Sequence, residues 1–115
     1  MAPKYREVFP NERADLERLL GSGNEEAIME ALVSAAFYDP EWKWVQTTCL
    51  RFLDHPDKRV RCSAATCLGH VARIHRRLDI EIIVPRLIAL SGDPSIRPHA
   101  ETALDDINHF IVRPQ

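Results

Sequence analysis

The residue types that do chemistry in proteins are present in this chain, but their spacing fits neither a catalytic site nor a metal site. Cys62 and Cys67 are separated by four residues, whereas zinc and redox pairs have the shorter C-x-x-C spacing. His70 and His75 are five apart and therefore diverge around a helix. The serines lack a nucleophile-elbow setting, and the Gly-Ser-Gly of residues 21–23 is not followed by the Lys of a phosphate loop. We therefore expect a protein that is not an enzyme and that needs no cofactor or metal.

A polar stripe within residues 57–77 is the strongest candidate for binding. Its members recur at intervals of four, three, four, three and four, which places them on one face of a helix. They are Arg59, Ser63, Thr66, His70, Arg73 and Arg77. A solvated outer face is the simpler interpretation, because charged residues usually stay exposed. However, the stripe contains no Asp or Glu, whereas a merely soluble face usually mixes both signs, and this difference favours a partner-binding role.

Two tryptophans add a second candidate surface. Trp42 and Trp44 lie two residues apart, about 200° on a helix, so both cannot face the core. Trp42 continues the apolar positions, whereas Trp44 lines up with Thr48 and Arg51 on an adjacent face. Trp44 either packs under the N-terminal segment or, together with Arg51, forms the Trp and Arg combination that is enriched at interface hot spots.

The elements that must position these residues are repeated along the chain. Residues 57–71, DKRVRCSAATCLGHV, return as residues 93–107, DPSIRPHAETALDDI, at an offset of 36 residues. This offset is typical of a helical pair that stacks on a copy of itself to form an α-solenoid. Each copy carries one apolar stripe with helical spacing, in which small residues allow a neighbouring helix to approach closely. The stripes are Val60, Ala64, Cys67, Leu68 and Val71, and Ile96, Ala100, Ala103, Leu104 and Ile107.

Capping residues predict where the helices begin. Short polar side chains that precede apolar periodic runs accept the free N–H groups of the first turn, and a Pro suits the first helical position. The predicted caps are Asn11, Asn24, Asp39 before Pro40, Asp57, and Asp93 before Pro94. The predicted helices cover residues 12–20, 25–38, 40–53, 57–77, 80–91 and 94–110. Because Pro98 cannot donate a backbone hydrogen bond, we expect a distorted first turn in the last of these helices.

The Asp or Asp-Pro cap, the Val-Arg pair, the small residues and the Leu of residues 57–71 resemble the first helix of a HEAT repeat. Residues 79–90, DIEIIVPRLIAL, are similar to the second helix of such a unit, and the resemblance covers roughly residues 24–110. It implies an all-α fold, a short right-handed α-α superhelix of about six helices. The expected organisation is one domain over 1–115, with an N-terminal cap at 1–23, repeat units at 24–56, 57–92 and 93–110, the last incomplete, and a tail at 111–115.

Composition and charge narrow the class of protein. With 115 residues, 45% hydrophobic and 28% charged, the chain is expected to be one globular domain. It has neither the apolar run of a membrane span nor a secretory signal, so we expect a cytoplasmic protein. Its cysteines are odd in number, and we expect all three to be reduced thiols: Cys49, Cys62 and Cys67.

The formal net charge of −2 is unevenly distributed along the chain. It is the sum of −4 over residues 1–50, +5 over residues 51–77 and −3 over residues 78–115. A solenoid keeps sequence neighbours adjacent in space, so this basic band is expected to form a real patch on the surface.

Solenoid repeats usually bind rather than catalyse, and three functions fit this sequence. Free-standing chains similar to this one occur among bacterial immunity proteins, and the resemblance implies one protein partner, a toxin neutralised by direct binding. The expected contact residues are Trp44, Arg51, Arg59, His70, Arg73 and Arg77. Some HEAT-like glycosylases grip duplex DNA, but the pI near 6.2 is low for a phosphate-binding domain. The third function is a scaffold in which an incompletely capped end pairs with its own copy as a homodimer.

Overall fold

The computed structural model describes residues 11–113, which form six α-helices and one short π-helical segment. The all-α prediction is therefore confirmed. The helices are α1 (Arg13–Leu20), α2 (Glu25–Tyr38), α3 (Trp42–Phe52), α4 (Lys58–His75), α5 (Ile80–Leu90) and α6 (Arg97–Ile107), and the π-helical segment η1 (Asn108–Val112) follows α6 directly.

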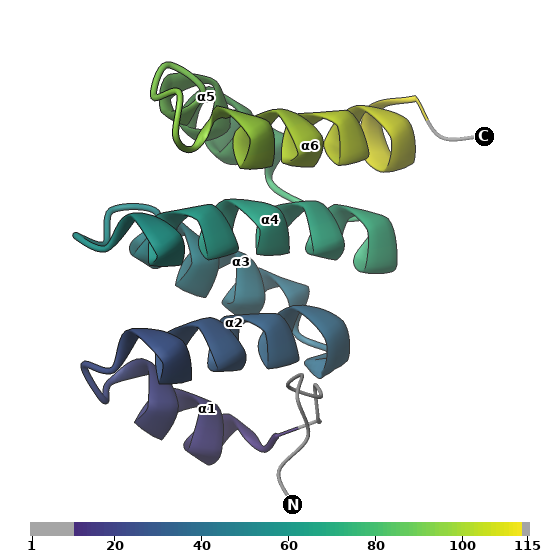
Figure 1. The fold of residues 1–115 in the computed structure, drawn as a ribbon. Coiled ribbons are helices and arrows are strands. Elements are labelled where there is room, and N and C mark those ends of the chain that lie inside the picture. Colours follow the sequence, from purple (N-terminus) through teal and green to yellow (C-terminus); the bar gives the residue numbers. More distant parts are fainter. Residues whose placement is uncertain (1–10, 114–115) are drawn as a thin grey trace, which may run out of the picture.

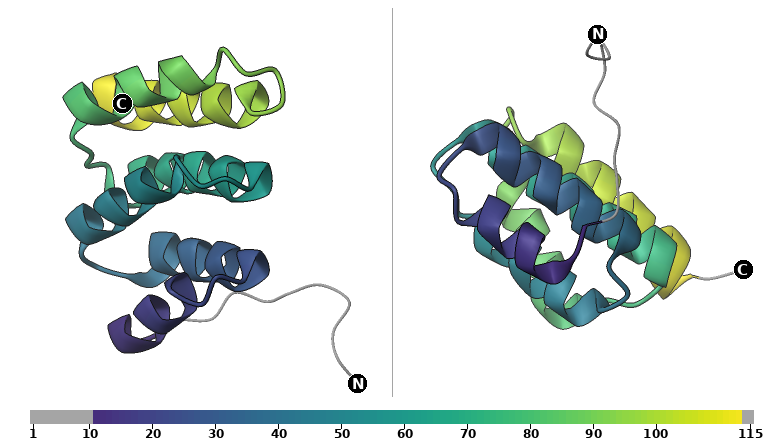
Figure 2. Two further views of the ribbon diagram at one scale, coloured as in Figure 1. Left: turned by 90° about the vertical axis from the view of Figure 1, so that its left-hand side faces the viewer. Right: turned by 90° about the horizontal axis from the view of Figure 1, so that it is seen from below.

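The helices form two layers. Helices α2, α4 and α6 lie side by side and run in the same direction, and α1, α3 and α5 form the second layer behind them (Figures 1 and 2). As a result, the α2–α3 and α4–α5 loops lie at the same edge of the stack as the C-terminal end of α6, while the other loops lie at the opposite edge (Figure 2). Segments 57–71 and 93–107, which repeat in sequence, occupy matching positions in α4 and α6.

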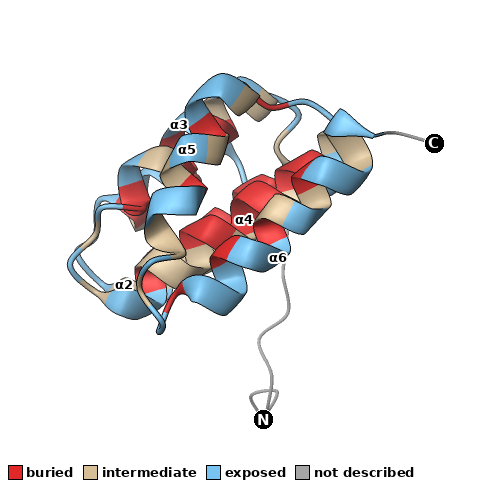
Figure 3. Ribbon diagram, turned by 90° about the horizontal axis from the view of Figure 1, so that it is seen from above, coloured by how far each residue is buried: buried red, intermediate tan, exposed pale blue. Residues whose placement is uncertain are grey.

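The core lies between the two layers and follows the predicted apolar stripes (Figure 3). All five predicted stripe residues of α4 are buried, and so are four of the five in the second stripe, where Ile96 directly precedes α6 and Leu104 is partly buried. Burying a Val or Leu side chain contributes about 1.5–3 kcal/mol, so this shared core is the main stabilising term. Many of the other buried positions are alanines, and their small side chains allow the helix axes to approach closely.

Gly69 marks the closest approach between α4 and α6. A Cβ at this position would lie 3.1 Å from Cα of Ala103 and 2.7 Å from Oδ2 of Asp106. The contact with Ala103 is the more serious, because that atom belongs to the backbone of α6 and cannot rotate away. Glycine in a helix interior usually destabilises by about 1 kcal/mol relative to alanine, so its presence here indicates that packing outweighs helix propensity.

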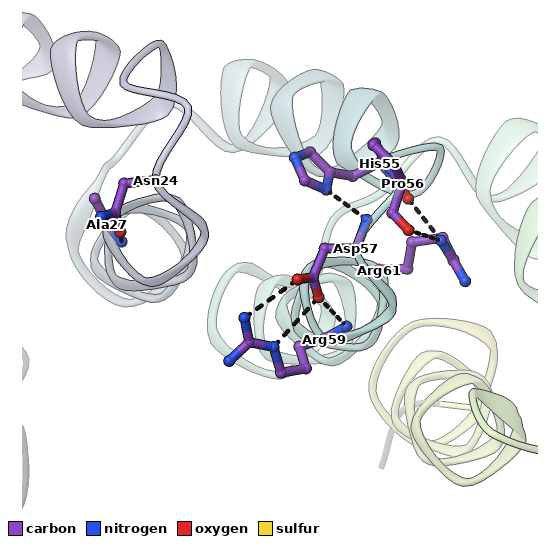
Figure 4. A network of polar contacts seen from close by, with 7 residues as sticks. All are labelled: Asn24, Ala27, His55, Pro56, Asp57, Arg59 and Arg61. Atoms are coloured by element: carbon purple, nitrogen blue, oxygen red, sulfur yellow. Dashed lines mark hydrogen bonds and ion pairs between the residues drawn. The ribbon is translucent and has the colours of Figure 1, made fainter.

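The caps of α2 and α4 are confirmed. Oδ1 of Asn24 accepts a hydrogen bond from the backbone N–H of Ala27 at 2.9 Å, and Oδ1 of Asp57 accepts one from the N–H of Arg59 at 2.7 Å (Figure 4). Each interaction satisfies a donor that the first helical turn leaves unpaired, and losing such a cap costs about 1 kcal/mol.

The caps predicted for α1 and α3 are wrong, because both helices begin later than predicted, and both side chains also bind residues that are distant in sequence. Asn11 donates from Nδ2 to the hydroxyl of buried Ser34 at 3.1 Å, and α1 begins after Glu12 without a side-chain cap. Oδ1 of Asp39 accepts from the backbone N–H of Glu41 at 2.9 Å and so caps a separate turn, while the carboxylate also accepts from Arg13 at 3.1 and 3.2 Å. Helix α3 begins two residues later than predicted, at Trp42. Local pattern alone cannot reveal either distant partner, since each lies more than twenty residues away in sequence.

The start of α6 also differs from the prediction. The carbonyl of Asp93 accepts from the N–H groups of Ile96 and Arg97, and its Oδ1 accepts from the N–H and hydroxyl of Ser95, so Asp93 caps a separate turn. Pro98 has no N–H to donate to the carbonyl of Pro94. The α-helix therefore begins only at Arg97, with Pro98 as its second residue, and the predicted distortion at Pro98 is confirmed.

A buried amide fixes the start of α5. Gln46 on α3 is only 3% exposed, and its Nε2 donates to Oδ2 of Asp79 at 2.8 Å while its Oε1 accepts from the backbone N–H of Asp79. Both ends of the amide are thus satisfied, which removes the cost of burying it. The contact joins the start of α5 to the middle of α3.

Replacing Gly69 with valine is expected to destabilise the protein by about 2 kcal/mol, because the branched side chain forces α6 away from α4. Chemical denaturation followed by circular dichroism measures the free energy of unfolding. The control is Gly92→Val at the α5–α6 loop, where a Cβ meets nothing closer than the carbonyl oxygen of Ala89 at 3.4 Å. Equal losses in the two variants would contradict the proposed close approach.

Candidate partner-binding surfaces

Two of the predicted site residues, Trp44 and Arg51, line one hollow. The hollow has a volume of about 260 Å³ and lies between α1 and α3. Its walls are Glu17, Leu20, Gly21, Trp44, Thr48 and Arg51. The guanidinium carbon of Arg13 lies 3.9 Å from the centre of the Trp44 ring, and Arg13 is itself held by the ion pair with Asp39. Trp44 therefore packs against the N-terminal helix α1, and it also borders this hollow together with Arg51; its role as an interface hot spot stays a prediction.

His70 and Arg73 lie on a different surface, the outer face of the α2, α4 and α6 layer. The His70 imidazole stacks on the ring of Phe37 from α2, with centroids 4.8 Å apart and an interplanar angle of 30°. Nη2 of Arg73 donates to Nδ1 of His70 at 3.0 Å, which requires the neutral imidazole to carry its proton on Nε2. Burial, and then the nearby Arg73 charge, lower the pKa of His70, while Asp106 on α6 opposes this shift.

Two further contacts extend this face onto α6. The hydroxyl of Thr66, a member of the predicted stripe, lies 3.1 Å from Nδ1 of His99. Asp106 lies close enough to Arg73 and His70 for both charges to lower the pKa of its carboxyl, but burial outweighs them and the pKa is raised. The outer face of α4 is therefore connected to both neighbouring helices and is not an isolated solvated stripe.

Arg59 lies at the opposite end of α4 and forms an ion pair with Asp57, the residue that caps this helix. Its guanidinium pairs with Asp57 at 3.2 Å, and this pairing raises the pKa of Arg59 and lowers that of Asp57 (Figure 4). The same carboxylate caps the helix, so the pair has a local structural role in addition to any role in binding.

Arg77 does not lie on the α4 stripe, although the sequence predicted a helix up to this residue. The helix ends at His75, and Arg76 adopts a left-handed conformation with φ of 55°. This change of direction carries Arg77 over the ring of Trp42, with 5.5 Å between its guanidinium carbon and the ring centre. The prediction failed because a left-handed residue usually is glycine, and no glycine marks this end in the sequence.

The basic band of residues 51–77 does not form one patch. Lys58, Arg59 and Arg61 lie at the start of α4, and Arg73, Arg76 and Arg77 lie at or beyond its end. Arg61 and Arg73 are twelve positions apart, about 18 Å along the helix. The expected single patch is therefore wrong: six of the seven basic residues form two groups at opposite edges of the stack, and the seventh, Arg51, lies on α3.

Sequence reasoning missed three residues that build the second of these groups. They are Phe37, Arg76 and Phe110, and the two aromatic residues lie on elements other than α4. The guanidinium carbon of Arg73 lies 6.0 Å from the centre of the Phe37 ring, and that of Arg76 lies 5.3 Å from the centre of Phe110. The only available signal was the Arg76-Arg77 pair, because nothing local in the sequence pairs these cations with rings from α2 and η1.

The comparisons with known proteins agree with this geometry. The sequence model of the HEAT repeat matches residues 45–75. A chain in the crystal structure of a CDI complex from Cupriavidus taiwanensis LMG 19424 is 32% identical, with a TM-score of 0.84, and the alignment covers 95% of this chain and 98% of that one. The chain belongs to the HEAT-repeat family. No curated protein matches it.

The matched stretch of this HEAT-repeat protein pairs different helices from the predicted unit over 57–92, and the unit boundaries stay a prediction. Residues 45–75 comprise most of α3 and all of α4, so the family model joins α3 to α4, whereas the prediction joined α4 to α5 in a unit over 57–92.

Within residues 11–113 no group of three metal-ligating side chains converges, and no helix is both long and apolar enough to cross a membrane.

The stability of the HEAT-repeat protein is expected to fall as the pH is lowered below about 6.5, the usual pKa of histidine. The folded state holds the pKa of His70 below that value, so the unfolded chain binds the proton first and is favoured as the pH falls. Urea denaturation at a series of pH values between 7 and 5 measures this slope. His70→Gln should flatten it and Ser63→Ala should leave it unchanged; identical slopes in all three proteins would contradict the assignment to His70.

Replacing Arg76 with glycine is expected to give a protein about 1 kcal/mol more stable than the Arg76→Ala variant. Both changes remove the contact with Phe110, but only glycine adopts the positive φ without strain. Thermal unfolding of the two variants measures the difference. If alanine were at least as stable as glycine, the left-handed conformation at Arg76 would be ruled out.

Proposed function

We propose that this HEAT-repeat protein is an immunity protein that neutralises a cognate toxin by binding it directly, without catalysis. The observation that carries the proposal is the match over nearly the whole of both chains to a chain from a CDI complex, where CDI denotes contact-dependent inhibition. A match of this extent at 32% identity includes the helical layers and the loops that join them, so it concerns the whole binding scaffold and not one repeat.

The internal contacts support a binding function. The helix caps, the Gln46–Asp79 pair and the Arg13–Asp39 ion pair fix the helices and the loops relative to one another. A partner that docks on such a scaffold loses little free energy in ordering it. The exposed arginines and aromatic rings are residue types enriched at interface hot spots.

The test uses the gene adjacent to the one that encodes this chain. We expect the toxin domain encoded there to stop growth when expressed alone, growth to recover on co-expression with this chain, and the two proteins to elute as one complex of fixed stoichiometry. The toxin domain of the Cupriavidus CDI complex serves as the non-cognate control. Absence of both rescue and complex would overturn the proposal.

Two matched double variants identify the face that binds. Trp44→Ala with Arg51→Ala removes two side chains that line the hollow between α1 and α3, and His70→Ala with Arg73→Ala removes the side chains at the centre of the α4 face. Loss of a hot spot costs at least about 2 kcal/mol, so the variant in the true interface should weaken the dissociation constant by about thirtyfold. Isothermal titration calorimetry measures the affinity. Unchanged affinity in both would exclude both surfaces from the interface.

A further inference from the structure

Four cations gather at one edge of the stack. Lys43 follows the α2–α3 loop, Arg73 lies in the last turn of α4, and Arg76 and Arg77 lie in the α4–α5 loop. These loops lie at the same edge as the C-terminal end of α6, as the two-layer arrangement requires (Figures 1 and 2). We call this surface the arginine edge and define it by Lys43, Arg73, Arg76 and Arg77 with the rings of Phe37, Trp42 and Phe110.

Each cation of the arginine edge lies over an aromatic ring. Arg73 lies over Phe37 and Arg76 over Phe110, as given above, and both Lys43, at 5.8 Å, and Arg77, at 5.5 Å, lie over Trp42. A ring orders a guanidinium through one flat face and leaves the N–H donors in its plane able to bind a ligand. The rings therefore hold the cations in place without using their N–H donors, although Nη2 of Arg73 donates separately to Nδ1 of His70.

The other arginines of the described chain are mostly engaged by carboxylates or carbonyls. Arg13, Arg18, Arg59 and Arg86 form ion pairs with Asp39, Asp15, Asp57 and Asp54. Figure 4 shows the opposite edge, where Arg59 is held by its cap and Nη1 of Arg61 donates to the carbonyls of His55 and Pro56. At the arginine edge, in contrast, none of the three arginines forms an ion pair among residues 11–113. Of the four cations, Lys43 has a carboxylate partner there, with 3.8 Å between its Nζ and Oδ2 of Asp79.

The backbone at Arg76 gives an independent reason to regard this edge as functional. Its φ of 55° is the only positive φ of a non-glycine residue in the described chain. A side chain in this conformation costs about 1 kcal/mol relative to glycine, and strained residues of this kind concentrate at functional sites. The chain keeps an arginine at this position, with its side chain on the exposed surface.

We propose that the arginine edge binds a carboxylate-rich segment of the partner protein. Planar guanidinium groups match carboxylates through paired N–H···O bonds, and groups already ordered on rings lose less entropy when they bind. The inference rests on the proposed protein-binding function and adds the chemistry of the segment recognised.

The charge of the flanking helices favours a compact acidic segment over a nucleic acid. Residues 11–50 carry 3 basic and 8 acidic groups, a net charge of −5, and residues 78–113 carry 3 and 6, a net charge of −3. Asp79 lies 3.8 Å from Lys43, and Asp106 interacts electrostatically with Arg73, so acidic units border the arginine edge along the stack. A long polyanion such as duplex DNA would extend over these units and be repelled by them. A short segment of Asp and Glu residues can contact the four cations without reaching these acidic units.

The test is an NMR titration of the full chain with a short peptide of alternating Glu and Gly. We expect the Trp42 Nε1–H and the backbone N–H groups of residues 73–77 to shift, and the shifts to shrink as salt is added. Two triple variants carry the same change in net charge. The edge variant is Arg73→Gln, Arg76→Gln and Arg77→Gln, and the control variant is Arg18→Gln, Lys58→Gln and Arg97→Gln. The edge variant should bind the peptide about tenfold more weakly than the unchanged chain. The control variant should bind it with the affinity of the unchanged chain.

Each other outcome overturns the inference. Equal loss in the two variants would mean attraction by net charge alone, and tighter binding of a duplex DNA of equal charge would mean recognition of phosphates. Circular dichroism of both variants shows whether they remain folded.

The growth assay separates this inference from the proposed function. If the edge variant still neutralises the toxin with unchanged affinity, the protein remains an immunity protein but the arginine edge is not its binding surface.

Discussion

The close packing of α4 between α2 and α6 is the constraint on which the rest of the structure depends. Many of the buried residues of these helices are alanines, and Gly69 lies so close to α6 that an added Cβ would be 3.1 Å from Cα of Ala103. Large side chains would hold the helices apart and open voids. Because the three helices are parallel and close, their C-terminal ends, and the loops that leave them, lie at one edge of the stack.

This packing explains how a small helical chain presents defined chemistry on its surface. Residues from α2, α3, α4 and η1 meet at the arginine edge only because the layers are stacked in register, and the Trp44 hollow exists only because α1 lies against α3. The two surfaces lie on different parts of the molecule. A partner that engaged either one would contact ordered side chains, and the capping and inter-helical hydrogen bonds keep those side chains in place.

Sequence patterns predicted the features that depend on local interactions. The apolar stripes of α4 and α6 and the caps at Asn24 and Asp57 were predicted, because each involves residues at most four positions apart. Predictions were incomplete or wrong where residues distant in sequence bind the same group. Asn11 binds Ser34, and Asp39 binds Arg13 as well as the backbone N–H of Glu41, and neither residue is the cap of the helix predicted for it. The roles of Gln46 and Phe110 were missed for the same reason, since their partners come from other helices.

By itself the sequence determined that the chain is a stack of amphipathic helices, since helical periodicity and a 36-residue repeat are properties of the order of residues along the chain. Tertiary structure decided which of the charged side chains stay available to a partner. The sequence shows seven basic residues between positions 51 and 77, but whether each meets a carboxylate, a carbonyl or an aromatic ring depends on which helices pack together. The end of α4 shows the reason most directly, because the left-handed turn at Arg76 places Arg77 beside a ring from α3, a helix that begins more than thirty positions earlier in the sequence.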